Sequence, residues 1–307
     1  MRFLLRDGKQ KEASMNVERH TNDEQIALWN GRAGRAWVEM QELLDRVFKP
    51  LEDLLAETIL AESADRVLDV GCGTGSTTLA VARLLGAKGS CIGIDISAPM
   101  IAVARSRAER EGAPASFIRA NAQTHAFEPA SFDMIISRFG VMFFDDPVQA
   151  FANLRRAASG DAKLRFIAWR SAAENPFMTT AERAAAPLLP NLPARRPDAP
   201  GQFAFADQRR VHSILEESGW AEIDIHPIDV ACALSEEELV HYVTRLGPVG
   251  LLLQEADDQT RAHVIETVRA AFDPYVHGAE VHFTAACWVV SAQASSASSV
   301  PTDAASV

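Results

Sequence analysis

The sequence predicts an α/β fold with a doubly wound, mostly parallel sheet and a helical lid inserted late in the chain. Two observations support this prediction. Between Arg66 and Trp169, short apolar segments suited to buried strands alternate with segments of helical spacing, which is typical of a parallel sheet with helices on both faces. The chain has 307 residues, 48% of them hydrophobic, and can bury a large core. We therefore expect one large domain over residues 23–290.

Residues 23–62 carry apolar side chains at helical spacing. We expect them to form a helical cap that breaks at Gly31 and Gly34, because glycine weakens helix interiors. Residues 1–22 are expected to form a flexible N-terminus. The first 15 of them hold no more than three consecutive apolar residues, too few for the core of a signal peptide.

The alternating region can be divided into elements from its apolar segments and turn residues. The expected strands are 67–70, 91–95, 116–120, 134–137, 164–169, 221–231 and 281–290, and the expected helices are 75–85, 98–111, 147–158 and 207–219. Local signals support several helix ends. Ser97 and Asp146 are suited to cap the starts of two helices, and Gly86 lies where another should end.

Two segments interrupt the regular alternation. Residues 171–206 include a proline-rich loop, and residues 232–279 contain a capping box of Ser235 and Glu238 followed by helical spacing. We expect both segments to cover the substrate at the carboxyl edge of the sheet, where open α/β folds bind their ligands. Residues 291–307 are a tract of small residues and are expected to form a disordered tail.

Composition excludes some classes of partner. The net charge is −11 and no long run of Lys or Arg is present, so nucleic acid is not an expected partner. No apolar run is long enough to cross a bilayer, and a soluble cytoplasmic protein is expected. No metal is expected, because the four cysteines lack metal-ligand spacing and fit buried positions: Cys72, Cys91, Cys232 and Cys287.

A glycine-rich loop follows the first expected strand, in the stretch VLDVGCGTGS from Val67 to Ser76. Its glycines, Gly71, Gly73 and Gly75, alternate, whereas a dinucleotide loop has G-x-G-x-x-G and an ATP or GTP loop continues into G-K-[ST]. Asp69, two residues before the first glycine, would place a negative charge where a diphosphate would bind. This carboxylate favours a ligand with an ammonium group.

The stretch LDVGCGTG resembles the first motif of class I S-adenosylmethionine-dependent methyltransferases, whose pattern is acid-x-G-x-G-x-G. The resemblance is strongest over residues 67–170, and the chain is most similar to the small-molecule branch that includes ubiquinone and menaquinone methyltransferases. It implies a Rossmann-like sheet of seven strands with the last strand antiparallel. It also implies S-adenosylmethionine as cofactor, with S-adenosylhomocysteine as product.

Further residues fit the cofactor site that this resemblance implies. Asp95 follows Gly75 by 20 residues, where a carboxylate can bind both ribose hydroxyls, as it does in NAD enzymes. The resemblance implies that Ile96 and Met100 pack against adenine. Asn121 and Ala122 stand where the family usually has Asp-Ala at the adenine edge, and Asn can still accept a hydrogen bond there.

The segment FDMIISRFGVMFFDDP, from Phe132 to Pro147, resembles the fourth strand and following loop of the family. The resemblance implies that Ser137 and Arg138 border the methionine portion of the cofactor, with Phe139 and Met142 beside the transferred methyl group. Phe143 and Phe144 are expected in the core. Trp29 and Trp37 fall in the helical cap that commonly closes this site, and packing in the core is an equally good interpretation of both.

Methyl transfer is an in-line displacement, so the protein mainly positions the acceptor and excludes water. The catalytic residues are unknown from the sequence, and the candidates are His241 and Tyr242 as bases and Arg138 as an anchor for an anionic acceptor. A solvated surface histidine is the simpler interpretation of His241. Apolar side chains could line a pocket for a neutral, hydrophobic or aromatic small molecule: Phe177, Met178, Phe203, Phe205 and Leu251 to Leu253.

Two other functions remain open from the sequence. A non-catalytic S-adenosylmethionine-binding protein would keep the glycine loop, and an NAD(P)-dependent reductase would keep the acid at Asp95. The acceptor atom, whether oxygen, carbon or nitrogen, stays open. So does the oligomeric state, for which a homodimer is one candidate.

Overall fold

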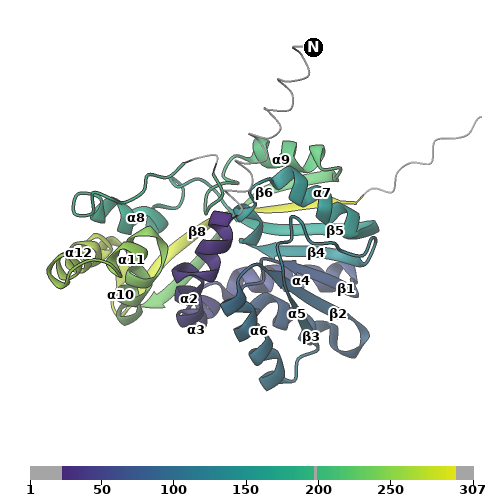
Figure 1. The fold of residues 1–307 in the computed structure, drawn as a ribbon, viewed down its shortest axis with the longest axis horizontal. Coiled ribbons are helices and arrows are strands. Elements are labelled where there is room, and N and C mark those ends of the chain that lie inside the picture. Colours follow the sequence, from purple (N-terminus) through teal and green to yellow (C-terminus); the bar gives the residue numbers. More distant parts are fainter. Residues whose placement is uncertain (1–22, 197–198, 295–307) are drawn as a thin grey trace, which may run out of the picture.

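The structure is a computed structural model that describes residues 23–196 and 199–294. The expectations for residues 1–22 and for most of the tail lie outside these described residues. Figure 1 shows a sheet between two layers of helices, with a further group of helices at one end. The strands are β1 (Arg66–Val70), β2 (Ser90–Asp95), β3 (Ala115–Arg119), β4 (Phe132–Arg138), β5 (Ala158–Trp169), β6 (Ala221–Ser235), β7 (Val276–His277) and β8 (Glu280–Gln293).

The sheet has the order β3-β2-β1-β4-β5-β8-β6. Strands β1 to β5 pair in parallel, whereas β8 runs antiparallel to both β5 and β6. The predicted doubly wound, mostly parallel sheet with an antiparallel last strand is therefore confirmed. The short β7 pairs with β8, so the described sheet has eight strands where seven were predicted.

Helices cover both faces of the sheet. Helices α4, α5 and α6 lie on one face, and α7 and α9 lie on the other (Figure 1). Because they are covered on both sides, the central strands β1 and β4 bury almost all of their side chains. The helices of this layered region are α2 (Arg32–Glu39), α3 (Gln41–Val47), α4 (Lys49–Glu62), α5 (Ser76–Leu85), α6 (Ala98–Glu111), α7 (Pro147–Ala157) and α9 (Gln208–Glu217).

The predicted helix starts are confirmed where a local side chain caps the helix. The Ser97 hydroxyl accepts the backbone N–H of Met100 at the start of α6, and Asp146 does the same for Gln149 at the start of α7. Ser235 begins the first helix of the second insertion with the predicted capping box. These caps satisfy backbone N–H groups that have no partner within the helix.

The N-terminal helical cap is broken once. A helix over residues 23–30 ends at Gly31, as predicted, but Gly34 lies inside α2. The prediction of a break at Gly34 is wrong because that glycine serves close packing. A Cβ atom there would lie 1.9 Å from the carbonyl oxygen of Trp29 and 2.9 Å from the Ser97 hydroxyl.

The end of the sheet differs from the prediction. Strand β8 continues to Gln293 and pairs with β5 over its last residues, and Ala294 is buried. The prediction of disorder from residue 291 is therefore wrong for residues 291–294. Small side chains give a weak hydrophobic signal, but the backbone hydrogen bonds of a ladder do not depend on side-chain size.

Helices from the two insertions gather at one end of the molecule (Figure 1). Helix α8 comes from the first insertion and packs against α11 and α12 of the second, while α11 also contacts α2 of the N-terminal cap. The three segments therefore meet beside the carboxyl end of β5. The helices of this group are α8 (Pro176–Ala185), α10 (Glu236–Arg245), α11 (Gly247–Leu253) and α12 (Asp258–Ala271).

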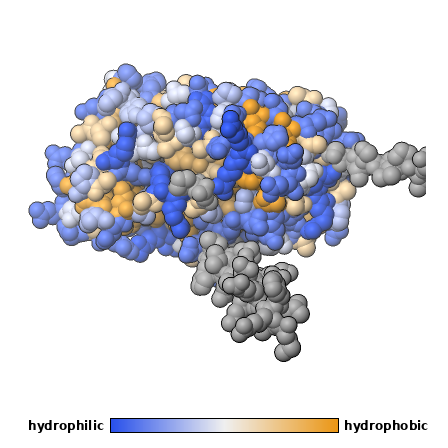
Figure 2. Space-filling model, turned by 90° about the horizontal axis from the view of Figure 1, so that it is seen from above, coloured by the Kyte–Doolittle hydropathy of each residue, from blue (hydrophilic) through white to orange (hydrophobic). Residues whose placement is uncertain are grey.

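The face shown in Figure 2 is mostly hydrophilic, with hydrophobic residues in separate areas. In the part of the chain that is described, no helix is long and apolar enough to span a membrane. The large hydrophobic side chains that are exposed come from the 23–30 helix, α4 and α5: Ile26, Leu28, Leu54, Leu60 and Leu84. They are distributed over several helices.

Candidate active site

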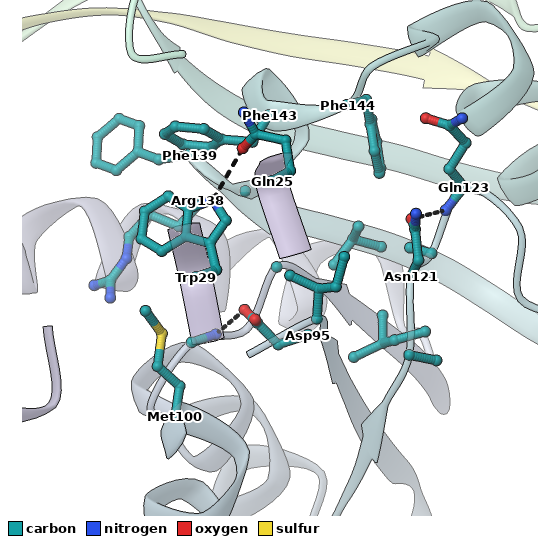
Figure 3. A pocket seen from close by; sticks show the side chains of 18 of the residues that line it. Gln25, Trp29, Asp95, Met100, Asn121, Gln123, Arg138, Phe139, Phe143 and Phe144 are labelled. Carbon is teal, nitrogen blue, oxygen red and sulfur yellow. Dashed lines mark hydrogen bonds between the residues drawn. The ribbon is translucent and has the colours of Figure 1, made fainter. Parts of the chain in front are cut away.

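A first cavity lies at the carboxyl ends of β1 to β4, and Figure 3 shows the side chains that surround it. It encloses about 130 Å³. Loops from four neighbouring strands contribute its floor, because parallel strands end at the same edge of a sheet. The predicted cofactor residues that line it are Gly71, Gly73, Asp95, Ile96, Met100, Asn121, Ala122, Arg138 and Trp37.

The glycine loop brings backbone to the cavity floor. Gly71 has a φ of +69°, and a Cβ atom there would lie 2.5 Å from the Cα of Gly140. Gly71 therefore has to be glycine for contact within the protein. Gly73 differs, because the nearest atom to a Cβ there, leaving out its chain neighbours, is the Met100 sulfur at 3.6 Å. The space beside Gly73 belongs to the cavity.

The Asp95 carboxylate joins the glycine loop to the segment that precedes α6. One carboxylate oxygen accepts the backbone N–H of Gly73 at 2.8 Å (Figure 3). The other accepts the backbone N–H of Ser97, also at 2.8 Å. Burial raises the pKa of Asp95, and these N–H groups oppose that rise. The two carboxylate oxygens have about four lone-pair sites between them, so the group can still accept a hydrogen bond from a ligand hydroxyl.

The far end of the cavity is built after β3. The side-chain oxygen of Asn121 accepts the backbone N–H of Gln123 at 2.9 Å (Figure 3). Gln123 in turn accepts the backbone N–H of Asp146 at 3.1 Å and donates to Gln149 at 2.8 Å. The turn after β3 is thereby joined to the loop after β4, and Asp145 of that loop lines the cavity.

The N-terminal cap covers the cavity with residues of the 23–30 helix. The Asn30 side chain donates to the carbonyl of Ile96 at 3.1 Å and accepts the N–H of Ala98 at 2.9 Å. The Ser97 hydroxyl donates to the carbonyl of Trp29 at 2.6 Å. These bonds hold the 23–30 helix on the start of α6. Gln25 and Trp29, which bond to each other, line the cavity from this helix (Figure 3).

Four aromatic side chains separate the first cavity from a second one. Trp29, Trp37, Phe139 and Phe143 line both cavities, and we call this group the aromatic collar. Trp29 meets Trp37 and Phe143 edge to face, at ring separations of 6.1 and 5.0 Å. Phe139 has the unusual φ of +68° and stacks on Trp169 at 4.6 Å. Such strained backbone is concentrated at functional sites.

The second cavity lies between the N-terminal cap and the two insertions and encloses about 900 Å³. Among the predicted acceptor residues, Phe177, Met178, Phe203, Leu251 and Leu252 line it. Two of the predicted residues do not, because they pack in the core: Phe205 and Leu253.

Three predicted cofactor residues do not line the first cavity: Asp69, Gly75 and Ser137. Asp69 points toward α5, where its carboxylate accepts the Thr78 hydroxyl at 2.7 Å. Burial raises the pKa of Asp69 to about 6, against that hydrogen bond and the nearby Arg138. A strand buried on both faces gives no sequence signal of which way each side chain points.

Ser137 and Gly75 have structural contacts instead. The Ser137 hydroxyl donates to the carbonyl of Val70 at 2.7 Å and accepts the N–H of Gly140 at 3.2 Å, joining β4 to β1. A Cβ at Gly75 would lie 2.9 Å from the ring of Phe117. Met142, predicted beside the methyl group, is buried and lines neither cavity.

The structure places the three candidate catalytic residues in different surroundings. His241 is exposed and lines neither cavity, which fits a solvated histidine. Tyr242 lines the second cavity and donates to the Met178 sulfur at 3.5 Å; burial raises the pKa of its phenol well above the usual value. Arg138 lines the first cavity and donates to the carbonyl of Phe48 at 3.4 Å, with no ion pair among the described residues.

Sequence reasoning missed several residues of the site. Phe143 and Phe144 were expected in the core, but both are partly exposed and line the first cavity. Gln25, Gln123 and Asp145 were not predicted at all. Gln25 and Gln123 lie outside the motif segments, whereas Asp145 lies within the segment from Phe132 to Pro147 but was given no role there. Only the fold brings the three side chains to the cavity.

Comparison with known proteins now identifies the central region. Residues 67–160 match the family model of a methyltransferase domain. The aklanonic acid methyltransferase DauC of Streptomyces sp. (strain C5) is 35% identical over 106 residues, which are 34% of this chain and 48% of DauC. A demethylmenaquinone methyltransferase of Lactiplantibacillus plantarum is 36% identical over 112 residues, 36% of this chain and 47% of that protein. Residues 67–160 of this chain are a methyltransferase domain.

Solved structures agree with the fold of this methyltransferase domain. The YcgJ protein of Bacillus subtilis is 18% identical, with a TM-score of 0.52 over 79% of this chain and 97% of that one. The [4+2]-cyclase SpnF is also 18% identical, with a TM-score of 0.50 over 81% of each chain. At these identities the likeness concerns the fold alone. The chain spans about half the length of the curated relatives it matches.

The cofactor of this methyltransferase family fits the residues present in the first cavity. The open space beside Gly73 allows close approach of a ligand to the backbone. At the other end, a buried carboxylate oxygen of Asp145 has no hydrogen-bond partner among the described residues, so a ligand donor could satisfy it. Within the described ranges, no group of three or more His, Cys, Asp or Glu side chains could hold a metal ion.

Proposed function

We propose that the protein transfers the methyl group of S-adenosylmethionine to oxygen, carbon or nitrogen of a small, largely hydrophobic or aromatic acceptor. The observation that carries this proposal is the junction of the two cavities. The first cavity is lined by most of the residues predicted to bind the cofactor, and the second shares with it the four side chains of the aromatic collar. A cofactor in the first cavity would thus direct its methyl group toward an acceptor in the second.

The cofactor, when bound, supplies a methyl group that its sulfonium already activates. The chain positions the reactants and keeps water away, and these two effects supply most of what an in-line displacement needs. Asp95 would hold the ribose, while the Gly71 to Gly73 loop supports the methionine portion. The collar would surround the positive sulfonium with aromatic faces, which attract cations.

The second cavity supports the class of acceptor that we propose. Its wall is mainly aliphatic and aromatic, as in most small-molecule sites. Among its described lining residues, Glu182 is the one carboxylate, and it pairs with Arg195 at 2.5 Å. A strong general base is thus not supplied from this wall. We therefore propose an acceptor whose nucleophile is reactive without one, with the cytoplasm as the location of the reaction.

An acceptor panel tests this proposal. Purified protein is incubated with S-adenosylmethionine and hydrophobic phenols, quinols, enols or amines, and S-adenosylhomocysteine is quantified. We expect formation that depends on one class of acceptor. Leu252→Arg, which places a charge in the second cavity, should abolish transfer and leave S-adenosylhomocysteine binding intact. The matched control, Leu84→Arg, changes an exposed leucine of α5 and should leave both properties unchanged.

A non-catalytic S-adenosylmethionine-binding protein remains the second candidate. The fold by itself does not determine the reaction, so binding of S-adenosylmethionine without transfer of its methyl group has to be tested directly. Tight binding of S-adenosylhomocysteine together with no turnover across the whole acceptor panel would support this candidate and contradict the proposed transfer.

A further inference from the structure

Asp145 has a carboxylate oxygen that is buried and has no hydrogen-bond partner among the described residues. The side chain lines the first cavity, whereas its neighbour Asp146 does not line it and instead caps α7. Burial raises the pKa of Asp145 to about 6, and the charge of Glu24 on the N-terminal cap adds to the rise. A buried acceptor without a donor is costly, so a ligand donor is the expected partner.

The position of Asp145 places it at the adenine end of the cavity. The loop after β4, the strand beside β1, lines the cavity with residues from Phe139 to Asp145. The backbone N–H of Asp146 is bonded to the side chain of Gln123 at 3.1 Å, which holds the loop against the turn that begins at Asn121. Asp145 therefore lies at the end of the cavity formed after β3, away from Gly73.

The amide oxygens at this end are already engaged within the protein. The Asn121 side-chain oxygen accepts the N–H of Gln123 at 2.9 Å, and the Gln123 side-chain oxygen accepts the N–H of Asp146. The Gln123 amide group also donates to Gln149 at 2.8 Å. These bonds fix both side chains in the turn and leave the Asp145 carboxylate as the acceptor without a donor.

We infer that Asp145 accepts a hydrogen bond from the exocyclic amino group of adenine and so makes the site specific for a 6-aminopurine. The inference rests on the proposed function, because it requires S-adenosylmethionine in the first cavity. The amino group of adenine is a donor only, which complements a carboxylate. A 6-oxopurine would present an acceptor oxygen at the same place, and two acceptors repel each other.

The test compares two ligands that differ at this one group. Calorimetry measures the affinity of S-adenosylhomocysteine and of S-inosylhomocysteine, in which oxygen replaces the amino group, for the full chain. We expect the wild-type protein to prefer S-adenosylhomocysteine by about 10- to 100-fold, the range of a hydrogen bond to a charged group. Asp145→Asn can donate to the oxygen and should reduce this preference to about threefold or less.

Asp146→Asn is the matched control, because it makes the same chemical change one residue away and Asn also caps helices well. It should keep the wild-type preference. An unchanged preference in Asp145→Asn would overturn the inference while leaving the cofactor assignment in place. Failure of the wild-type protein to bind S-adenosylhomocysteine would instead overturn the proposed function and the inference with it.

Discussion

Substitution of Gly73 tests whether this glycine faces a ligand, in contrast to Gly71, which packing within the protein requires to be glycine. All three glycines of the loop have positive φ, but a Cβ atom meets different surroundings at each. At Gly71 it would lie 2.5 Å from the Cα of Gly140, whereas at Gly73 it would lie 3.6 Å from the flexible side chain of Met100. Gly73→Ala therefore adds a methyl group mainly to the cavity.

The two effects of Gly73→Ala differ in size. A non-glycine residue at a φ of +55° costs about 1–2 kcal/mol of folding free energy, which lowers the melting temperature by about 2–8 °C in a domain of this size. Overpacking of a ligand against the new methyl group costs about 1–3 kcal/mol more. That second cost weakens binding of S-adenosylhomocysteine by about 5- to 150-fold.

Calorimetry with S-adenosylhomocysteine, at a temperature where the variant is folded by circular dichroism, measures the binding effect. Thermal melts without ligand measure the stability effect. Gly71→Ala is the control, and it should lose more stability than Gly73→Ala because backbone atoms cannot move aside easily. Wild-type affinity in folded Gly73→Ala would refute the reasoning that the cofactor approaches this backbone.

Three further predictions concern side chains of the site. Asp95→Asn should weaken S-adenosylhomocysteine binding by about 100-fold or more, because it removes a charged acceptor and sets an amide donor against the N–H of Gly73 or Ser97. The control Asp65→Asn changes an exposed residue and should bind as the wild-type protein does. Equal affinities of Asp95→Asn and the wild-type protein in calorimetry would contradict the role of Asp95. The affinity of the wild-type protein for S-adenosylhomocysteine should fall as pH decreases through about 6, because the raised pKa of Asp145 lets the carboxylate of the free protein take up a proton that opposes binding. Calorimetric titrations at several pH values should show a weaker pH dependence in Asp145→Asn. Identical pH profiles of the two proteins would exclude Asp145 as the source. His241→Ala should leave the turnover number within about twofold of the wild-type value, because the histidine is exposed and lines neither cavity. A large loss of turnover in a steady-state assay would make His241 a candidate base again.

Local chemistry made much of the fold predictable. Ser97, Asp146 and Ser235 each cap a helix through the residue three positions away, so a short stretch of sequence contains the whole signal. The alternation of strands and helices likewise predicted the parallel sheet. Strand β8 was underestimated at its end because its pairing partners lie far away in the sequence.

The site was predictable only where its residues belong to a motif. Asp95 ends β2, and Gly73 and Asn121 follow the ends of β1 and β3; the sheet brings the three to one cavity. Asp69 was assigned to the ligand from its place before the glycines, but it turns toward Thr78, since a doubly buried strand gives no directional signal. Asp145 was missed because the bond that holds its loop in place, from the backbone N–H of the next residue, Asp146, to Gln123, joins two separate loops.

The most direct test of the account is calorimetry of the wild-type chain with S-adenosylhomocysteine and with NADH. The account predicts that S-adenosylhomocysteine binds at one site per chain and that NADH does not compete for it. Binding of NADH together with no binding of S-adenosylhomocysteine would contradict it, because the alternating glycines after β1 would then accept a diphosphate.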